Sequence, residues 1–287
     1  MMSEAILGEL RKKARDLGIE LDKPSPARVY DAGLGGTHNY AIDRAFLDQQ
    51  LTALPDLALM MRWNRAWVGR AVRFAIEQGV RQFVDIGSGL PTQGNIHEVA
   101  DIVARGEATV VYVDNDPIVQ AHSDLLLAAD ADPARHRAVC GSFFDYDDVW
   151  EQVLATHVID PAEPVCLVLA AVLHFMPPDT RPEVPLAFYR DQLPPGSLLA
   201  LSHAADVDDP AWQQVANNYK TKATLPGHLR KEEEIKPFFG DFELVEPGLT
   251  WITAWRPDDN TDRPTPEFRS RGLAGVGCKV ASEPAQS

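Results

Sequence analysis

The stretch Gln82-Phe83-Val84-Asp85-Ile86-Gly87-Ser88-Gly89-Leu90-Pro91-Thr92 decides the fold of this chain. Its first half, rich in β-branched and aromatic residues, is typical of a short buried strand. Its second half is a glycine-bearing turn, and Thr92 is a candidate N-cap for the helix that follows. That helix has apolar residues at helical spacing, and a second apolar run, residues 109–113, ends at Asp114. The sequence therefore predicts a βαβ unit with an acid at the tip of its second strand.

The spacing of the glycines indicates which ligand such a unit would hold. A dinucleotide fingerprint needs Gly-x-Gly-x-x-Gly or Ala, whereas Gly89 is followed by Leu-Pro-Thr and then by a glycine out of register. The missing third glycine disfavours a pyrophosphate at the helix N-terminus, and so a nucleotide-dependent oxidoreductase. A tight turn in an α/β protein without a nucleoside is the other alternative.

The same residues resemble the first two motifs of class I S-adenosylmethionine (SAM) methyltransferases. These motifs are Asp85-x-Gly87-x-Gly89 and, at the end of the next strand, Asp114. The resemblance implies that the two glycines pass close beneath the methionine part of the cofactor and that Asp114 holds the ribose.

Composition and charge narrow the class of protein. The chain has 287 residues, 45% of them hydrophobic, with a formal net charge of −15 and a pI near 4.9. This charge argues against nucleic acid as a partner, since phosphate binding needs clustered Lys and Arg. We find no apolar run of about 18 residues and no signal-peptide pattern, so we expect a soluble, cytoplasmic protein with no membrane partner. The three cysteines, Cys140, Cys166 and Cys278, lack Cys-x-x-Cys spacing and predict no metal site.

The first 80 residues predict helices outside the central sheet. Residues 4–17 form an amphipathic pattern, which indicates a lid or packing helix. The glycine-rich stretch 24–40 is compatible with a shaped, ligand-contacting loop or with a helix end, a turn and the next N-cap. Residues 55–76 predict one long helix, in which Asn64 and Arg65 are polar exceptions near the apolar side. Each of these two side chains is either solvated or in contact with a ligand.

Several motifs together resemble the S-adenosyl methyltransferase family, a bacterial family long catalogued as a domain of unknown function. The resemblance extends from about residue 24 to residue 277, and its most specific part is Leu90-Pro91-Thr92. Its other segments are residues 25–40, 43–44, 62–65, 85–89, 112–117 and 172–175. Membership implies a class I SAM-binding fold and supplies no acceptor. The cofactor-binding residues expected on this basis are Tyr30, Gly36, Asn39, Arg65, Asp85, Gly87, Ser88, Gly89, Asp114, Asn115, Phe144, Asp145 and Ala170.

The third predicted strand, near residues 137–140, leads to Phe144 and Asp145. Class I enzymes present an acid to the adenine amino group at the position of Asp145, and Phe144 could pack on the ring. Asp145, Asp147 and Asp148 are also compatible with acids that cap a helix N-terminus.

The fourth and fifth strands predict the acceptor side of the site. The most apolar run, residues 164–173, is typical of a buried parallel strand and ends at His174 and Phe175. Residues 196–203 predict the next strand, which ends at His203. Because doubly wound sheets bind ligands at this edge, we expect His174, Phe175 and His203 to bind the substrate, with His174 as the catalytic residue. The alternative is that each imidazole donates to a backbone carbonyl.

These patterns predict one α/β domain with a seven-stranded, mostly parallel, Rossmann-like sheet and an antiparallel terminal strand. Residues 1–80 would be a helical cap, residues 81–256 the SAM-binding core and residues 257–287 a surface tail, in which residues 274–277 could pack back. A hairpin of residues 242–246 and 250–255 would supply the antiparallel strand. The predicted function is SAM-dependent methyl transfer to a small molecule, since no Asn/Asp-Pro-Pro-Tyr motif follows strand 4. The alternative is a SAM-binding protein without transfer activity, and a homodimer is compatible with either.

Overall fold

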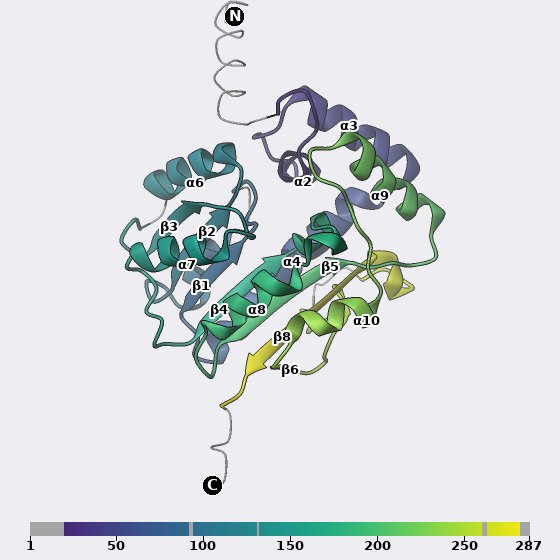
Figure 1. Ribbon diagram of the computed structural model, residues 1–287. Helices are drawn as coiled ribbons and strands as arrows, with labels where there is room; N and C mark the ends of the chain where they lie inside the picture. The colour runs from purple at the N-terminus through teal and green to yellow at the C-terminus, as the bar shows by residue number, and fades with distance from the viewer. Residues whose placement is uncertain (1–19, 92–93, 131, 260–262, 282–287) are drawn as a thin grey trace, which may run out of the picture.

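The computed structural model describes residues 20–91, 94–130, 132–259 and 263–281, so the helix predicted over residues 4–17 lies outside the described residues. A parallel sheet in the order β3-β2-β1-β4-β5 forms its centre, as Figure 1 shows. These strands are β1 (Gln82–Ile86), β2 (Thr109–Asp114), β3 (His136–Cys140), β4 (Val165–Ala170) and β5 (Leu198–Ala204). The predicted βαβ unit is confirmed, with helix α5 (Ile96–Val103) between β1 and β2. Thr92 lies outside the described residues, and the N-cap of α5 is Asn95.

The antiparallel end of the sheet differs from the prediction. Strand β8 (Gly272–Lys279) runs antiparallel beside β5, and both β6 (Phe242–Leu244) and β7 (Thr250–Trp251) pair with β8. The mostly parallel sheet is confirmed, but it has eight strands rather than seven, and the predicted hairpin is wrong because its two segments do not pair with each other. The surface tail is also wrong for residues 272–279, which form a largely buried strand.

Glycines explain why β8 was not recognised as a strand. Glycine is depleted in strands, and β8 contains three of them. Here they allow close packing, because a Cβ on Gly277 would lie 2.8 Å from the Cβ of Phe242. A Cβ on Gly275 would lie 3.2 Å from the ring of Phe239.

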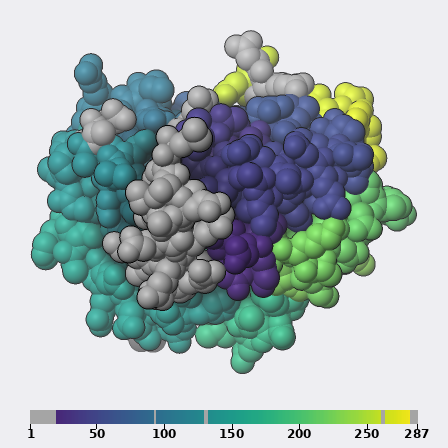
Figure 2. Space-filling model, turned by 90° about the horizontal axis from the view of Figure 1, so that it is seen from above, coloured from purple at the N-terminus to yellow at the C-terminus, as the bar shows by residue number. Residues whose placement is uncertain are grey.

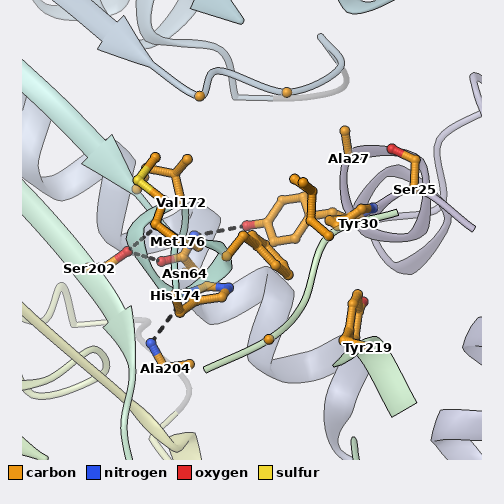
Figure 3. A pocket seen from close by; sticks show the side chains of 18 of the residues that line it. Ser25, Ala27, Tyr30, Asn64, Val172, His174, Met176, Ser202, Ala204 and Tyr219 are labelled. Carbon is orange, nitrogen blue, oxygen red and sulfur yellow. Dashed lines mark hydrogen bonds between the residues drawn. The ribbon is translucent and has the colours of Figure 1, made fainter. Parts of the chain in front are cut away.

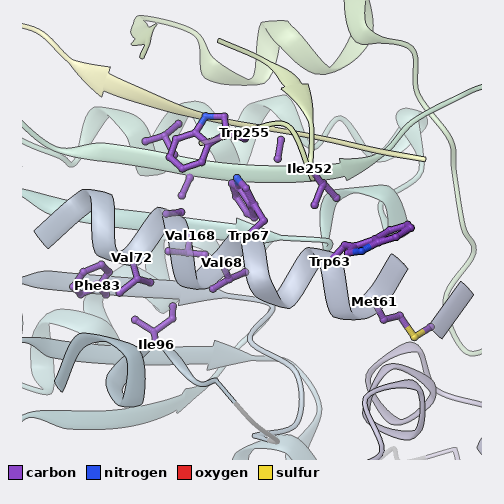
Figure 4. Packing of buried hydrophobic residues seen from close by; sticks show 14 of the residues in the cluster. Met61, Trp63, Trp67, Val68, Val72, Phe83, Ile96, Val168, Ile252 and Trp255 are labelled. Atoms are coloured by element: carbon purple, nitrogen blue, oxygen red, sulfur yellow. The ribbon is translucent and has the colours of Figure 1, made fainter. Parts of the chain in front are cut away.

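Helices cover both faces of the sheet. On one face, α4 (Leu57–Glu77) and α5 pack against side chains such as Phe83 and Val168, as Figure 4 shows. On the other, α7 (Tyr146–Ala155) and α8 (Glu183–Asp191) pack against Val84 and its neighbours. Helix α6 (Pro117–Asp130) connects β2 to β3. No helix among the described residues is long and apolar enough to cross a membrane.

Helix α4 is the most buried of the helices, and it anchors the chain around β7. Trp67 and Trp255 are fully buried, with an edge-to-face ring contact at 6.3 Å between centroids. Arg70 donates from Nε to the carbonyl of Trp255 and from a terminal nitrogen to that of Ile252, at 3.0 and 2.6 Å. Because aromatic burial and these hydrogen bonds act together, the segment after β7 is fixed against α4.

A helical cap lies over the carboxyl ends of the parallel strands. It consists of α2 (Pro26–Gly33) and α3 (Ala41–Ala53) together with α9 (Pro210–Lys222), which follows β5. Asn218 on α9 donates to Gln50 on α3 at 2.7 Å, and the rings of Phe46 and Tyr219 are in edge contact. The stretch 24–40 therefore contains a helix, a turn and the N-cap Tyr40, which is the second of the two structures with which its sequence is compatible. Short helical segments complete the fold: η1 (Leu173–Phe175), η2 (Pro178–Thr180), α10 (Glu232–Ile235), η3 (Lys236–Phe239) and η4 (Glu267–Ser270).

Candidate functional site

A cavity of about 670 Å³ follows the carboxyl edge of the sheet beneath the cap. It extends from Gly141, after β3, to Gly272, at the start of β8, and Ser25, Ala27 and Tyr30 of the cap line it. Figure 2 shows the cap helices beside α9 on this side of the molecule. Open α/β sheets bind ligands at this edge, and the volume is in the range of about 300–1,000 Å³ that is usual for small-molecule sites. The cavity is therefore the candidate functional site.

The two positions in the turn after β1, 87 and 89, require glycine for different structural reasons. Both have a left-handed backbone, with φ of +72° at Gly87 and +65° at Gly89. A Cβ on Gly87 would lie 2.3 Å from Cγ2 of Val172, so this glycine allows the β1 and β4 loops to approach each other. A Cβ on Gly89 would meet no atom within 4 Å. Gly89 therefore presents bare backbone to open space beside the cavity, which it lines.

Asp114 is held in a fixed orientation at the end of β2. Its Oδ2 accepts from the backbone N–H of Gly89 at 2.9 Å, and its Oδ1 accepts from that of Asp116 at 3.0 Å. Burial raises the pKa of Asp114 to about 6. Each carboxylate oxygen keeps a further lone pair, so Asp114 can accept two more hydrogen bonds, such as those of a vicinal diol.

Arg65 of α4 and Asp85 of β1 lie next to the glycine turn, and both line the cavity. Burial raises the pKa of Asp85 to about 7, while the positive charge of Arg65 opposes that rise. Nε of Arg65 is buried without a hydrogen-bond partner among the described residues. Its guanidinium lies over the ring of Tyr30, 5.7 Å from the centroid. An unpaired buried donor of this kind is available to an anion.

Most of the other residues expected to bind the cofactor line the same end of the cavity. Ser88, Asn115, Phe144 and Ala170 line the cavity, as do Ser142 and Phe143. Asp145 does not line it, because this residue is the N-cap position from which α7 turns away. Asp145 holds the N-cap position of the alternative interpretation, although its side chain makes no capping hydrogen bond. Its position outside the lining does not support the expected contact with adenine.

Two residues of the cap also have structural partners instead of facing the cavity. The side-chain amide of Asn39 donates to Asp31 Oδ2 at 2.8 Å and to the carbonyl of Gly36 at 2.9 Å. Gly36 in turn donates its N–H to the carbonyl of Asp31. Neither Gly36 nor Asn39 lines the cavity, which does not support their expected cofactor contacts. Their hydrogen bonds close the turn between α2 and α3.

Tyr30 lines the cavity at the end of a chain of hydrogen bonds, which Figure 3 shows. Ser202 of β5 donates to Asn64 Oδ1 at 2.6 Å, and the Asn64 amide donates to the Tyr30 hydroxyl at 3.0 Å. That hydroxyl donates to the carbonyl of Met61 at 2.9 Å. The chain joins β5, α4 and α2, so it fixes the cap over the sheet.

His174 points into the cavity with a defined tautomer. Nδ1 accepts from the backbone N–H of Ala204 at 3.4 Å, which leaves the proton of the neutral ring on Nε2. Burial, with Arg230 nearby, lowers the pKa of His174 to about 3. This shift in pKa disfavours a proton-accepting role for His174, and the Nδ1 contact leaves Nε2 as a donor. Phe175 lies beside it, with ring centroids 4.3 Å apart, and also lines the cavity.

Both ring nitrogens of His203 are already used. Nδ1 donates to the carbonyl of Ala204 at 2.8 Å, and Nε2 accepts from Arg230 at 2.8 Å. Arg230 also donates to the carbonyls of Leu173 and Met176, and so holds the segment that carries His174. His203 lines the cavity, but both of its ring nitrogens are satisfied within the protein, so the ring offers a substrate no free hydrogen-bonding nitrogen.

Two features of the site were missed in the sequence. Ala171, which follows β4, has a left-handed φ of +56°, and such strain in a non-glycine residue clusters at functional sites. Trp212 and Tyr219 of α9 and His228 of the following loop also line the cavity. The only sequence signal for these residues is the aromatic content of 212–219, which is equally typical of a packing helix.

The sequence matches the family model described as S-adenosyl methyltransferase over residues 12–280. A crystal structure from Thermobifida fusca YX, provisionally named as that of a methyltransferase, is 40% identical with a TM-score of 0.83. The match covers 92% of this chain and 98% of that chain. A DUF574 family protein from Streptomyces avermitilis MA-4680 is 35% identical with a TM-score of 0.83, over 90% of this chain and 98% of that chain. No curated protein matches the sequence.

Proposed function

Because the chain belongs to the S-adenosyl methyltransferase family and is a SAM-dependent methyltransferase, we propose that SAM binds over β1, β2 and β3 and a small-molecule acceptor over β4 and β5. The observation that supports this division most directly is the cavity itself, which is continuous along the carboxyl ends of all these strands. Its position beneath a cap that closes over the sheet suits a small acceptor.

The residues of the first half fit the chemical groups of SAM. The open space beside Gly89 leaves room for a ligand against bare backbone, and the carboxylate of Asp114 can accept both ribose hydroxyls. Phe143 and Phe144 offer apolar surface for adenine. Arg65, whose buried Nε has no partner among the described residues, fits the carboxylate of the methionine part.

When bound, SAM supplies a methyl group on an electrophilic sulfonium. The protein's own residues position the reactants and exclude water, which such a transfer needs more than a dedicated acid or base. Tyr30, Asn64 and Ser202 hold the cap against the sheet, and the cap covers the cavity. His174 directs its Nε2 proton into the cavity, so it would orient an acceptor oxygen or nitrogen by donating to a lone pair.

Calorimetry with S-adenosylhomocysteine tests the cofactor half of this proposal. Asp114→Ala should lower the affinity about 5- to 150-fold, equivalent to about 1–3 kcal/mol, because the ribose hydroxyls lose their acceptor. Asp145→Ala is the matched control, since it removes the neighbouring acid that the cavity does not include, and its affinity should equal that of the wild type. Equal affinities for both variants would refute the assignment of Asp114 to the ribose.

A further inference from the structure

The half of the cavity over β4 and β5 has a predominantly aromatic and aliphatic wall. We call this half the acceptor chamber and define it by Phe175, Met176, Trp212, Val215, Tyr219 and Ile252, which line it from η1, α9 and the segment after β7. All but Phe175 are buried, and the rings of Phe175 and Tyr219 are 5.6 Å apart. The indole N–H of Trp212 donates to the carbonyl of Ala205 at 2.9 Å, which fixes the ring. Such walls suit a flat apolar ligand.

The cations that line the cavity near this chamber are neutralised within the protein. Arg271 donates from Nε to Asp209 Oδ2 at 2.8 Å. Arg28 pairs with Asp43 at 2.8 Å, and Lys23 pairs with Glu20 at 3.2 Å. Arg65 is the exception among the described lining residues, and it lies at the cofactor end beside Asp85.

Burial favours the neutral form of the histidines that line the chamber. Burial lowers the pKa of His174 to about 3, and burial together with Arg230 and Lys220 lowers the pKa of His228 as well. An anionic acceptor in the chamber would therefore meet no lining cation without an acidic partner, since Arg65 lies at the cofactor end. Arg230 does not line the cavity, and its guanidinium donates to the carbonyls of Leu173 and Met176 and to His203. Transfer of an unpaired charge into such surroundings is strongly unfavourable.

One polar group of the wall lacks a partner of its own. Ser270, the last residue of η4, is 2% exposed, lines the cavity, and has a buried hydroxyl without a hydrogen-bond partner among the described residues. Buried hydroxyls are normally satisfied, so this group is available to a ligand.

We infer that the acceptor is an uncharged aromatic compound that carries hydrogen-bonding groups, as a phenol does, and that Ser270 binds one of these groups. This inference rests on the proposed function, because it assigns the acceptor to the second half of the same cavity. The chamber selects by charge: a neutral ring binds, and the matching carboxylate does not.

The test compares two probes of similar shape, 2-naphthol and 2-naphthoate, by calorimetry at neutral pH on protein saturated with S-adenosylhomocysteine. We expect 2-naphthol to bind at least about tenfold more tightly, because only the carboxylate loses hydration without gaining a counter-charge. Leu229→Arg, which places a cation at the lining, should reverse this preference. Val184→Arg on the exposed side of α8 is the matched control and should leave it unchanged.

Ser270→Ala should weaken 2-naphthol binding about fivefold and leave the affinity for S-adenosylhomocysteine unchanged. Equal or tighter binding of 2-naphthoate to the wild type would overturn the inference, and so would the absence of binding by either probe to the saturated protein. A protein that fails to bind S-adenosylhomocysteine refutes the proposed cofactor half instead, and the ratio of the two probe affinities on the free protein then still decides the charge preference.

Discussion

Alanine substitutions of Gly87 and Gly89 should differ in their main effect, although both glycines belong to one turn. Gly87→Ala should mainly reduce folding stability, and Gly89→Ala should mainly reduce ligand affinity. Both place a Cβ on a left-handed residue, which costs about 1–2 kcal/mol of folding stability. At Gly87 the new Cβ also lies 2.3 Å from Cγ2 and 2.8 Å from Cβ of Val172. Overpacking of this kind costs about 1–3 kcal/mol more. The expected loss is thus roughly 2–5 kcal/mol for Gly87→Ala and roughly 1–2 kcal/mol for Gly89→Ala.

Thermal unfolding and calorimetry separate the two effects. With about 2–4 °C per kcal/mol for a chain of this size class, Gly87→Ala should lower the melting temperature by roughly 4–20 °C and Gly89→Ala by roughly 2–8 °C. Affinity for S-adenosylhomocysteine should fall at least about tenfold in Gly89→Ala, because its methyl group occupies the space proposed for the ligand.

A double variant checks the cause. Val172→Ala removes the closest atom, so Gly87→Ala combined with Val172→Ala should be less destabilised than the sum of the two single changes. Strict additivity would show that the contact with Val172 is not what excludes a side chain at position 87. An unchanged affinity in Gly89→Ala would refute the proposal that a ligand lies against this turn.

Two further predictions concern the charges around the turn. Arg65→Leu should weaken S-adenosylhomocysteine binding by at least about tenfold in calorimetry, whereas Arg62→Leu, an exposed arginine on the same helix, should not; equal effects would mean that net charge alone matters. Asp85 has its pKa raised to about 7 by burial, so the folded protein holds this proton more tightly than the unfolded chain, and its contribution to stability is full below about pH 4 and is lost as the pH rises through about 7. Asp85→Asn should therefore raise the melting temperature more at high pH than at low pH, and a parallel shift at all pH values would contradict this assignment.

The cofactor half could be predicted from the sequence because its determinants are local. Gly87, Gly89 and Asp114 lie within a single βαβ unit, in which strand ends and turn residues determine their own positions. Asp145 and Asn39 were expected to contact the cofactor, but their positions are also explained by local structure. The Asn39 amide is satisfied by Asp31 and Gly36 within a turn, and Asp145 is the N-cap residue of α7, whose carbonyl accepts from Val149.

The acceptor half depends instead on contacts between segments far apart in the chain, which periodicity does not reveal. Ser202 meets Asn64 across 138 positions, and Asn218 meets Gln50 across 168. The second ring nitrogen of His203 is occupied by Arg230, which lies 27 positions away in the sequence. Ser270 lies in η4, just before β8, and β8 was not recognised because three of its eight residues are glycines.

This division between local and long-range determinants has a chemical consequence. The SAM half needs a short backbone turn and one carboxylate, which a brief motif can encode. The chamber is formed where η1, α9 and the segment after β7 meet, so its lining depends on many separate positions. Substitutions at Trp212 or Ile252 would reshape the chamber while the hydrogen bonds of Asp114 to Gly89 and Asp116 stay in place. The acceptor can therefore change while the cofactor site is kept. For this reason a family motif identifies SAM but not the acceptor. The acceptor has to be inferred from the charges and the unpaired hydroxyl of the chamber wall.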